Sequence, residues 1–273
     1  MTATSVSSSE PIARRSGASV ALAGTRPLFR KDVGEWRHGV RLWVVLIVTS
    51  AFMALAAANS AINQWVVANV AEAQGQDARI SLVPLDNVVI AVSSQVFIFA
   101  AIFAAMSLLV GERDRGTLSW IASKPVSRTS IWLSKFSSAT AMLWVAAAIV
   151  PMVITAAVAT VLYGVPSIPA LIVITLGMGA TIALFVAVVL AGSTLVASQP
   201  AVAAIGFAVL FLPALLGGIL PSTVLQFLPT SILSWAVGLA GGADVGYVAP
   251  VAWLAWMIGI GVFSARQMGR LEL

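Results

Sequence analysis

The sequence predicts an all-α membrane protein with six transmembrane helices, and three observations support this class. Hydrophobic residues fill 60% of the 273 positions and charged residues only 9%, against roughly 25% charged in an ordinary soluble domain. Apolar runs long enough to cross about 30 Å of hydrocarbon recur six times. The polar breaks between them are short, and basic residues cluster in a few of these breaks. We therefore expect lipid to be the main solvent of a single membrane domain.

The six apolar runs give the predicted spans, at about 42–62, 88–110, 138–162, 170–197, 202–220 and 247–265. A seventh apolar segment, 224–240, is marginal in length, contains Pro229 and ends at Gly241-Gly242. If it crossed the membrane, the last span would be reversed and its basic end exported. We therefore expect a re-entrant hairpin on the outer face, and an interfacial loop on the outer leaflet is the open alternative.

The positions of the basic residues orient the predicted bundle. Cytoplasmic loops carry an excess of Lys and Arg. If both termini and the connection 111–136 are cytoplasmic, 14 of the 15 basic residues lie inside and only Arg79 lies outside. We expect a multi-pass protein of the cell membrane of a prokaryote, with both termini cytoplasmic. Residues 1–24, rich in Ser and Ala, are predicted to be a disordered cytoplasmic tail ahead of a membrane domain over 25–273.

An amphipathic segment precedes the first span. Phe29, Val33, Trp36, Val40 and Trp43 recur at spacings of four, three, four and three, which makes one helical stripe. The charged residues between them are expected to stay in the polar headgroups. We therefore predict an N-terminal interfacial helix that lies flat on the membrane. A plain anchor and a part in coupling fit this helix about equally well.

The connection 111–136 is the only sizeable polar segment between spans, and it reads GERDRGTLSWIASKPVSRTSIWLSKF. Its charges continue the second helix into water until Gly116 and Thr117 interrupt it. A short helical piece through Ala122 follows, and Ser127 is placed to cap the next helix. The loop is therefore expected to protrude as a compact helix, turn and helix.

Two apolar side chains of this loop, Leu118 and Ile121, share one face of the short helical piece. Basic residues surround them. Such a face suits docking into a groove on another protein. From the residues alone, a loop that is basic only because it is cytoplasmic remains an equal alternative.

The loop resembles the signature region of the type 2 ABC permease family, which has a Glu, Gly-Thr-Leu, Pro-Val-Ser-Arg, a hydrophobic residue and a Lys in this order. Here these residues are Glu112, Gly116-Thr117-Leu118, Pro125-Val126-Ser127-Arg128, Ile131 and Lys135. The basic interfacial helix, the six spans and the apolar outer hairpin also match the family. The resemblance implies an exporter-type subunit that faces a second copy or a paralogue. It also implies an ABC ATPase subunit at the loop, with ATP and Mg held by that subunit.

The resemblance also implies roles for single residues. Residues 111–122 would form the coupling helix, continuous with helix 2, so that a displacement of Leu118 reaches the membrane half. Glu112 and Arg113 are expected to hold the angle of this lever. The full set expected at the ATPase contact is Glu112, Arg113, Gly116, Thr117, Leu118, Ile121, Pro125, Ser127 and Arg128.

Helices 2 and 5 border the transport pathway in this family. The pathway candidates on them are Gln95, Phe99, Met106, Phe207 and Phe211. For each aromatic residue taken singly, packing or a lipid-facing position is the favoured alternative. Gln95 is the stronger candidate, because a polar amide in hydrocarbon needs a partner or a hydrated path.

Several chemistries have no basis in the sequence. No phosphate-binding G-x-x-x-x-G-K-[ST] motif is present, so ATP hydrolysis is expected on a separate chain. With no Cys and a single His38, the usual disulfide and zinc sites cannot be built. We expect no catalytic residue, cofactor, metal or nucleic-acid partner.

These observations predict the transmembrane permease subunit of an ATP-driven ABC transporter, most simply an exporter of an unidentified substrate. A secondary transporter is one alternative, which the absence of ionisable residues well inside the spans disfavours. A membrane scaffold for maturation of another complex is the other.

Overall fold

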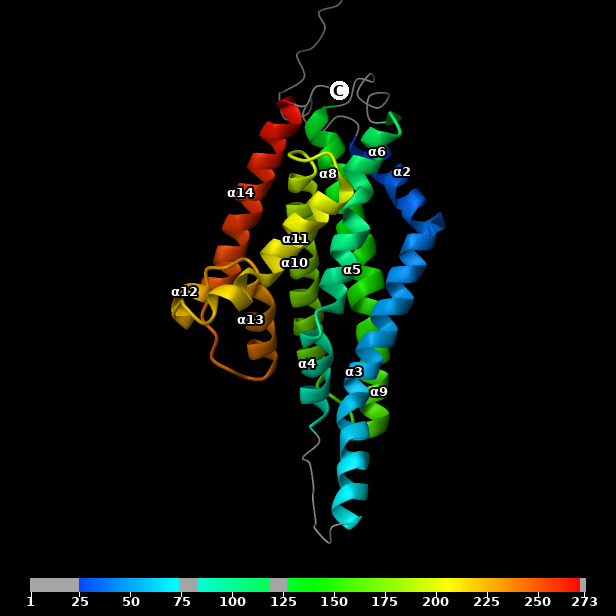
Figure 1. Cartoon of the computed structure of the whole chain (residues 1–273), viewed down its shortest axis with the longest axis vertical. Coiled ribbons are helices and arrows are strands. Elements are labelled where there is room, and N and C mark those ends of the chain that lie inside the picture. The colour runs from blue at the N-terminus through cyan, green and yellow to red at the C-terminus, as the bar shows by residue number, and fades with distance from the viewer. Residues whose placement is uncertain (1–24, 74–82, 118–126, 271–273) are drawn as a thin grey trace, which may run out of the picture.

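The computed structural model describes residues 25–73, 83–117 and 127–270, and every regular element in these ranges is a helix. Six helices are long and apolar enough to cross a membrane: Val40–Asn63, Pro84–Asp114, Arg128–Tyr163, Ile168–Gly192, Gln199–Leu216 and Val248–Arg270. The predicted all-α class and the predicted number of long apolar helices are confirmed (Figure 1). The predicted tail, residues 1–24, lies outside the described residues.

The N-terminal part of this region forms two helices, α2 (Thr25–His38) and α3 (Val40–Ala73), which meet at an angle beside Gly39 (Figure 1). The prediction that Phe29 to Trp43 form one apolar stripe is wrong, because the chain turns at Gly39 and the stripe is divided between two helices. Trp36 on α2 is buried, whereas Val40 and Trp43 on α3 are 76% and 57% exposed.

The second long segment consists of three helices, α4 (Pro84–Ser93), α5 (Val96–Ala105) and α6 (Ser107–Asp114). Gln95 separates α4 from α5 with a left-handed φ of 55°, a conformation uncommon for any residue but Gly. Met106 keeps right-handed helical angles, so α5 continues in the direction of α6. Gly116, with φ 67°, ends the helical path. The expectation of an unbroken helix 2 is therefore wrong at Gln95, whereas the predicted interruption at Gly116 is observed.

The third segment starts with α8 (Arg128–Trp144), widens into a π-turn, η1 (Val145–Ile149), and ends with α9 (Val150–Tyr163). Pro151 follows the π-turn and cannot donate a backbone hydrogen bond. The hydroxyl of Thr49 on α3 donates to the carbonyl of Ala146 at 3.2 Å. A side chain from a neighbouring span thus bonds a backbone carbonyl within the widened turn.

The C-terminal half contains α10 (Ile168–Gly192), α11 (Gln199–Leu216), α12 (Ser222–Leu225), α13 (Ser231–Ala240) and α14 (Val248–Arg270). The ten residues of α13 reach only about 15 Å, so the seventh apolar segment is too short to cross as a helix. It packs along α10, where a Cβ added at Gly177 would overlap the Cβ of Ala236.

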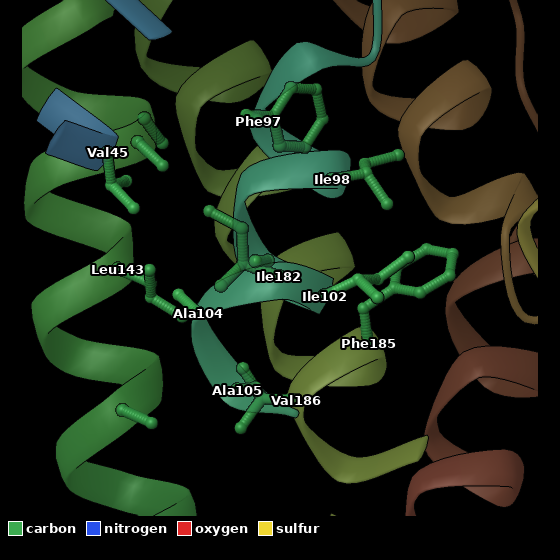
Figure 2. Packing of buried hydrophobic residues seen from close by; sticks show 14 of the residues in the cluster. Val45, Phe97, Ile98, Ile102, Ala104, Ala105, Leu143, Ile182, Phe185 and Val186 are labelled. Carbon is green, nitrogen blue, oxygen red and sulfur yellow. The ribbon is translucent and has the colours of Figure 1, made fainter. Parts of the chain in front are cut away.

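The core lies around α10. In its most apolar stretch 61% of the residues are buried, against 17% in the corresponding stretch of α14. Figure 2 shows α5 packed between α8 and α10. Ile182, Phe185 and Val186 of α10 lie among side chains from the other three helices: Phe97, Ile98, Ile102, Ala104 and Ala105 of α5, Leu143 of α8 and Val45 of α3. This packing fixes α5, and with it α6, in the centre of the bundle.

Candidate functional site

The described flanks of the signature loop, 111–117 and 127–136, lie at one end of the bundle, which we call the loop end. It comprises α2, α6, the first turns of α8 and the last turn of α14 (Figure 1). Three of the predicted contact residues, Leu118, Ile121 and Pro125, lie outside the described residues. The remaining six can be placed, and their side chains or backbones bond within the chain.

A buried charge cluster lies at the centre of the loop end, formed by Asp32, Glu112 and Lys135. The Lys135 ammonium is 2.7 Å from one Glu112 carboxylate oxygen and 3.8 Å from Asp32. The residues are 7%, 4% and 5% exposed. The hydroxyl of Ser134 donates to the other Asp32 oxygen at 2.5 Å. One cation on α8 therefore joins two carboxylates, one from α2 and one from α6.

The cluster follows from the packing of α2 against α8. Asp32 lies on the same helical face as Phe29 and Trp36, at spacings of three and four residues. When that face packs on α8, Asp32 is buried with its apolar neighbours. The expectation that the charges of this segment all stay in the headgroups is therefore wrong for Asp32. Burial of its charge is tolerated because a cation and a hydroxyl compensate it.

Three carboxylates of this region, from Asp32, Glu35 and Glu112, have oxygens within 4.8 Å of one another. Oxygen ligands of this kind suit a hard divalent cation. However, Lys135 already contacts Asp32 and Glu112, and Lys31 contacts Glu35 at 3.3 Å and Glu112 at 4.0 Å. The two ammonium groups neutralise the position that a metal ion would take, so we interpret the group as an ion-pair cluster.

Both flanks of the loop are bonded to other helix ends. On the first flank, the Arg113 guanidinium donates to the carbonyl of Ser193, just after α10, at 3.2 Å. The Thr117 hydroxyl donates to the carbonyl of Glu112 at 3.1 Å, and the positive φ of Gly116 allows the chain to turn there. The first flank is thereby fixed to the connection between α10 and α11.

On the second flank, Ser127 caps α8: its hydroxyl accepts a hydrogen bond from the Ser130 amide at 3.0 Å. The predicted capping role is confirmed. The Arg128 guanidinium donates to the carbonyls of Met268 and Gly269, both at 3.1 Å. A cation at the last carbonyls of a helix is favourable for the helix dipole. The signature arginine therefore binds the end of the last span.

The sequence alone did not identify Asp32, Ser134 or the buried position of Lys135. One signal was present, because Asp32 shares the apolar stripe of α2, and an acid on an apolar face needs a partner. The partner could not be found by spacing, since Asp32 and Ser134 are 102 residues apart in the chain.

The aromatic pathway candidates form one cluster between α5 and α11. The ring centroid of Phe99 lies 5.4 Å from that of Phe207 and 6.4 Å from that of Phe211. Phe103, which the sequence analysis did not single out, joins the cluster at 5.3 Å from Phe207. The position of Phe103 could have been predicted from its four-residue spacing from Phe99, which places both rings on one helical face. Phe103 and Phe211 are 54% and 49% exposed.

The other two pathway candidates lie apart from the aromatic rings. Gln95 is the left-handed residue between α4 and α5, and its side chain is exposed, without a hydrogen-bond partner among the described residues. Met106 is partly buried against the core at the junction of α5 and α6. Ile102, which lies between Phe99 and Met106 in the sequence, is fully buried in the core.

Comparison with known proteins identifies the family. A model of the ABC-2 family transporter proteins matches residues 26–233, from α2 into α13. A search of curated proteins gives no match to the chain. Permeases of this family are non-catalytic membrane subunits and typically pair with an ABC ATPase. Because the match extends over well more than half of the 273 residues, the chain belongs to the ABC-2 family as the membrane permease subunit of a transporter.

Proposed function

We propose that this permease is an exporter subunit driven by a separate ABC ATPase, which docks on the loop between α6 and α8. In this proposal Leu118 and Ile121 form the docking face. ATP and Mg are bound by the partner, and the permease converts its movement into movement of the spans. The observation that carries the proposal is the bonding of both loop flanks to other helix ends.

The side-chain bonds supply the stiffness that coupling requires. A single rigid helix cannot do so, because α6 ends at Asp114 and Gly116 turns the chain. Instead, Glu112 bonds Lys135 on α8, Arg113 bonds the end of α10, and Arg128 bonds the end of α14. A displacement of the loop would therefore act on several spans at once, through contacts that have short, defined geometry.

Orientation supports the same proposal. The loop end holds Thr25, Arg270 and the buried charge cluster, and the basic residues concentrate there. The positive-inside bias favours the cytoplasm for this end. We also propose that α2 lies at the membrane interface, that the loop couples movement of the ATPase to the spans, and that the hairpin lies on the outer side of the membrane.

The hairpin of α12 and α13 is proposed to enter and leave the membrane on the outer side. Trp256 donates from its indole to the carbonyl of Phe227 at 3.0 Å, and Trp235 donates to the carbonyl of Gly246 at 2.8 Å. These bonds hold the hairpin to α14 and to the connection before it. Irregular backbone at membrane depth persists where protein covers it, as α10 does here.

We further propose that the pathway runs beside the cluster of Phe99, Phe103, Phe207 and Phe211, between this permease and a second copy or paralogue. The cluster lies on α5 and α11, and parts of it are exposed in the single chain. Aromatic faces of this kind accept apolar groups without a specific hydrogen bond.

The docking proposal is tested by Leu118→Asp with Ile121→Asp. Burying two unpaired charges in the contact is expected to cost several kcal/mol of docking free energy. The measurement is co-purification of the cognate ATPase with wild-type and variant permease at equal membrane abundance. The matched control is Ser119→Asp with Ser123→Asp, which adds the same charge to the same loop at polar positions. Equal recovery of the ATPase with the first pair would contradict the docking proposal.

A further inference from the structure

Two cavities meet at the junction of α2 and α3. One is a polar cavity of about 580 Å³ among α2, α6 and α8, whose lining includes the buried charge cluster, Arg41 and Arg115. The other is an apolar groove of about 500 Å³ between α3 and α5, lined among others by Val44, Phe52 and Ala100. Val40 and Arg41 line both cavities. The two cavities therefore adjoin at Val40 and Arg41, one polar at the loop end and the other apolar along the spans.

The charges of the polar cavity are not all compensated. Its acidic groups, Asp32, Glu35 and Glu112, contact Lys135 or Lys31. Arg41 and Arg115 also line this cavity. Among residues 25–73, 83–117 and 127–270, no carboxylate lies within ion-pair distance of either guanidinium.

The polar contacts of the two arginines leave donors available. Arg41 donates from Nη1 to the carbonyl of Ala104 at 3.2 Å and lies over the Trp36 ring at 5.8 Å. Arg115 donates from Nε to the carbonyl of Gly111 at 2.8 Å. A guanidinium has five N–H donors, so each group retains several for an anion, and a phosphate suits them geometrically.

The apolar groove has the length of one leaflet. From Arg41 to Phe52 the axis of α3 advances about 16 Å, and half of the hydrocarbon core is about 15 Å. Both volumes fall within the range of about 300–1,000 Å³ found for small-ligand sites. An amphiphile with an anionic head and an apolar chain matches this order of charge and hydrophobic surface.

We propose that this site binds an anionic phospholipid of the leaflet at the loop end. Its phosphate lies between Arg41 and Arg115, and one acyl chain lies in the groove between α3 and α5. The lipid occupies the angle between α2 and α3, next to the charge cluster. This inference does not depend on ATPase docking.

The test uses the full-length chain, purified in detergent and depleted of lipid. Native mass spectrometry measures retention of 1-palmitoyl-2-oleoyl phosphatidylglycerol and of the phosphatidylcholine with the same chains. We expect about tenfold preference for the anionic lipid. Arg41→Gln with Arg115→Gln should abolish the preference, whereas Arg41→Lys with Arg115→Lys should keep most of it. Ala100→Phe, which fills the groove, should weaken retention of both lipids.

A matched control removes the same charge elsewhere at the loop end: Arg266→Gln with Arg270→Gln, two exposed residues of α14. This pair should keep the preference. Equal retention of the two lipids by the wild type would overturn the proposal, as would equal loss of preference in the control pair. Unchanged retention in Ala100→Phe would mean that no acyl chain lies in the groove, and displacement of the lipid by glycerol phosphate alone would mean that only the anion is bound. Either result would also overturn the proposal.

Discussion

The loop end and the contact between α10 and α13 both hold neighbouring helices together, but they use opposite chemistry. At the loop end, Lys135 joins Glu112 and Asp32, and arginines bond the carbonyls at other helix ends. Between α10 and α13, Gly177 faces Ala236 so closely that no additional carbon fits. A charged contact is stabilising only while its opposite charge is present, whereas a contact between small residues is stabilised by the close fit of the two helix surfaces.

This difference bears on which part of the permease can move. At the loop end, the long side chains of Lys and Arg can adjust and keep their partners when a helix shifts slightly. The contact of Gly177 with Ala236 has no such freedom, since separating it removes the packing altogether. We therefore expect α10 and α13 to move as one unit, and the bonded helix ends around the loop to follow a displacement of the loop while their side chains keep their partners.

The largest effect is expected from Lys135→Met, which removes the shared cation and leaves Asp32 and Glu112 buried and facing each other. Breaking a buried ion pair in this way costs about 3–5 kcal/mol. Unfolding by sodium dodecyl sulfate, followed by tryptophan fluorescence, measures the loss. The triple variant Asp32→Asn, Glu112→Gln, Lys135→Met should regain most of it, because no buried charge then remains.

Lys31→Met provides the control for this experiment. Lys31 also contacts Glu112, but at 4.0 Å and with 44% of its side chain exposed. A long contact made by a half-exposed lysine is expected to contribute about as little as a surface ion pair, about 0–1 kcal/mol. If Lys31→Met destabilised the protein as much as Lys135→Met, net charge rather than the buried cluster would be the cause, and the comparison between the two regions would fail.

Hydrophobic run length was sufficient to predict the six long helices, because a run of that length has few alternatives in lipid. The same information could not predict the break at Gln95. A polar residue in an apolar run is compatible with a helix, and its left-handed φ depends on how α4 and α5 pack against their neighbours. The continuity of helix 2 was overestimated for this reason.

The site residues show the same limit. Ser127 was predicted correctly as a helix cap, since capping depends on residues three positions apart. The partners of Glu112, Arg113 and Arg128 were not predictable, because each bond joins segments brought together only by the tertiary fold. The resemblance identified these residues as important, but it did not show that they bond within the chain.

An intermediate effect is expected at the apolar contact. Gly177→Ala places a methyl group against Ala236 and should cost about 1–3 kcal/mol, the usual range for overpacking. Adding Ala236→Gly should restore much of the stability, since the two changes share one space, and a double-mutant cycle measures their coupling. Gly261→Ala on α14, where an added Cβ meets nothing within 4 Å, is the control and should be close to neutral. Additive effects of the first two changes would show that α10 and α13 are not held by shape at this point.

The smallest effect is expected from a comparison of two helix starts, one at each end of the bundle. Ser127 precedes α8 at the loop end and bonds the Ser130 amide, whereas Ser167 precedes α10 at the opposite end and makes no capping bond. Ser127→Ala should therefore lower the free energy of unfolding by about 1 kcal/mol, and Ser167→Ala should leave it nearly unchanged. Both are measured by the same detergent-unfolding titration.

Because Ser127 also fixes the start of the helix that carries Arg128 and Lys135, its loss should weaken ATPase co-purification slightly, while Ser167→Ala should not. Equal stability changes at the two serines would mean that the bond to Ser130 contributes nothing, and the loop end would then depend on its charged contacts alone.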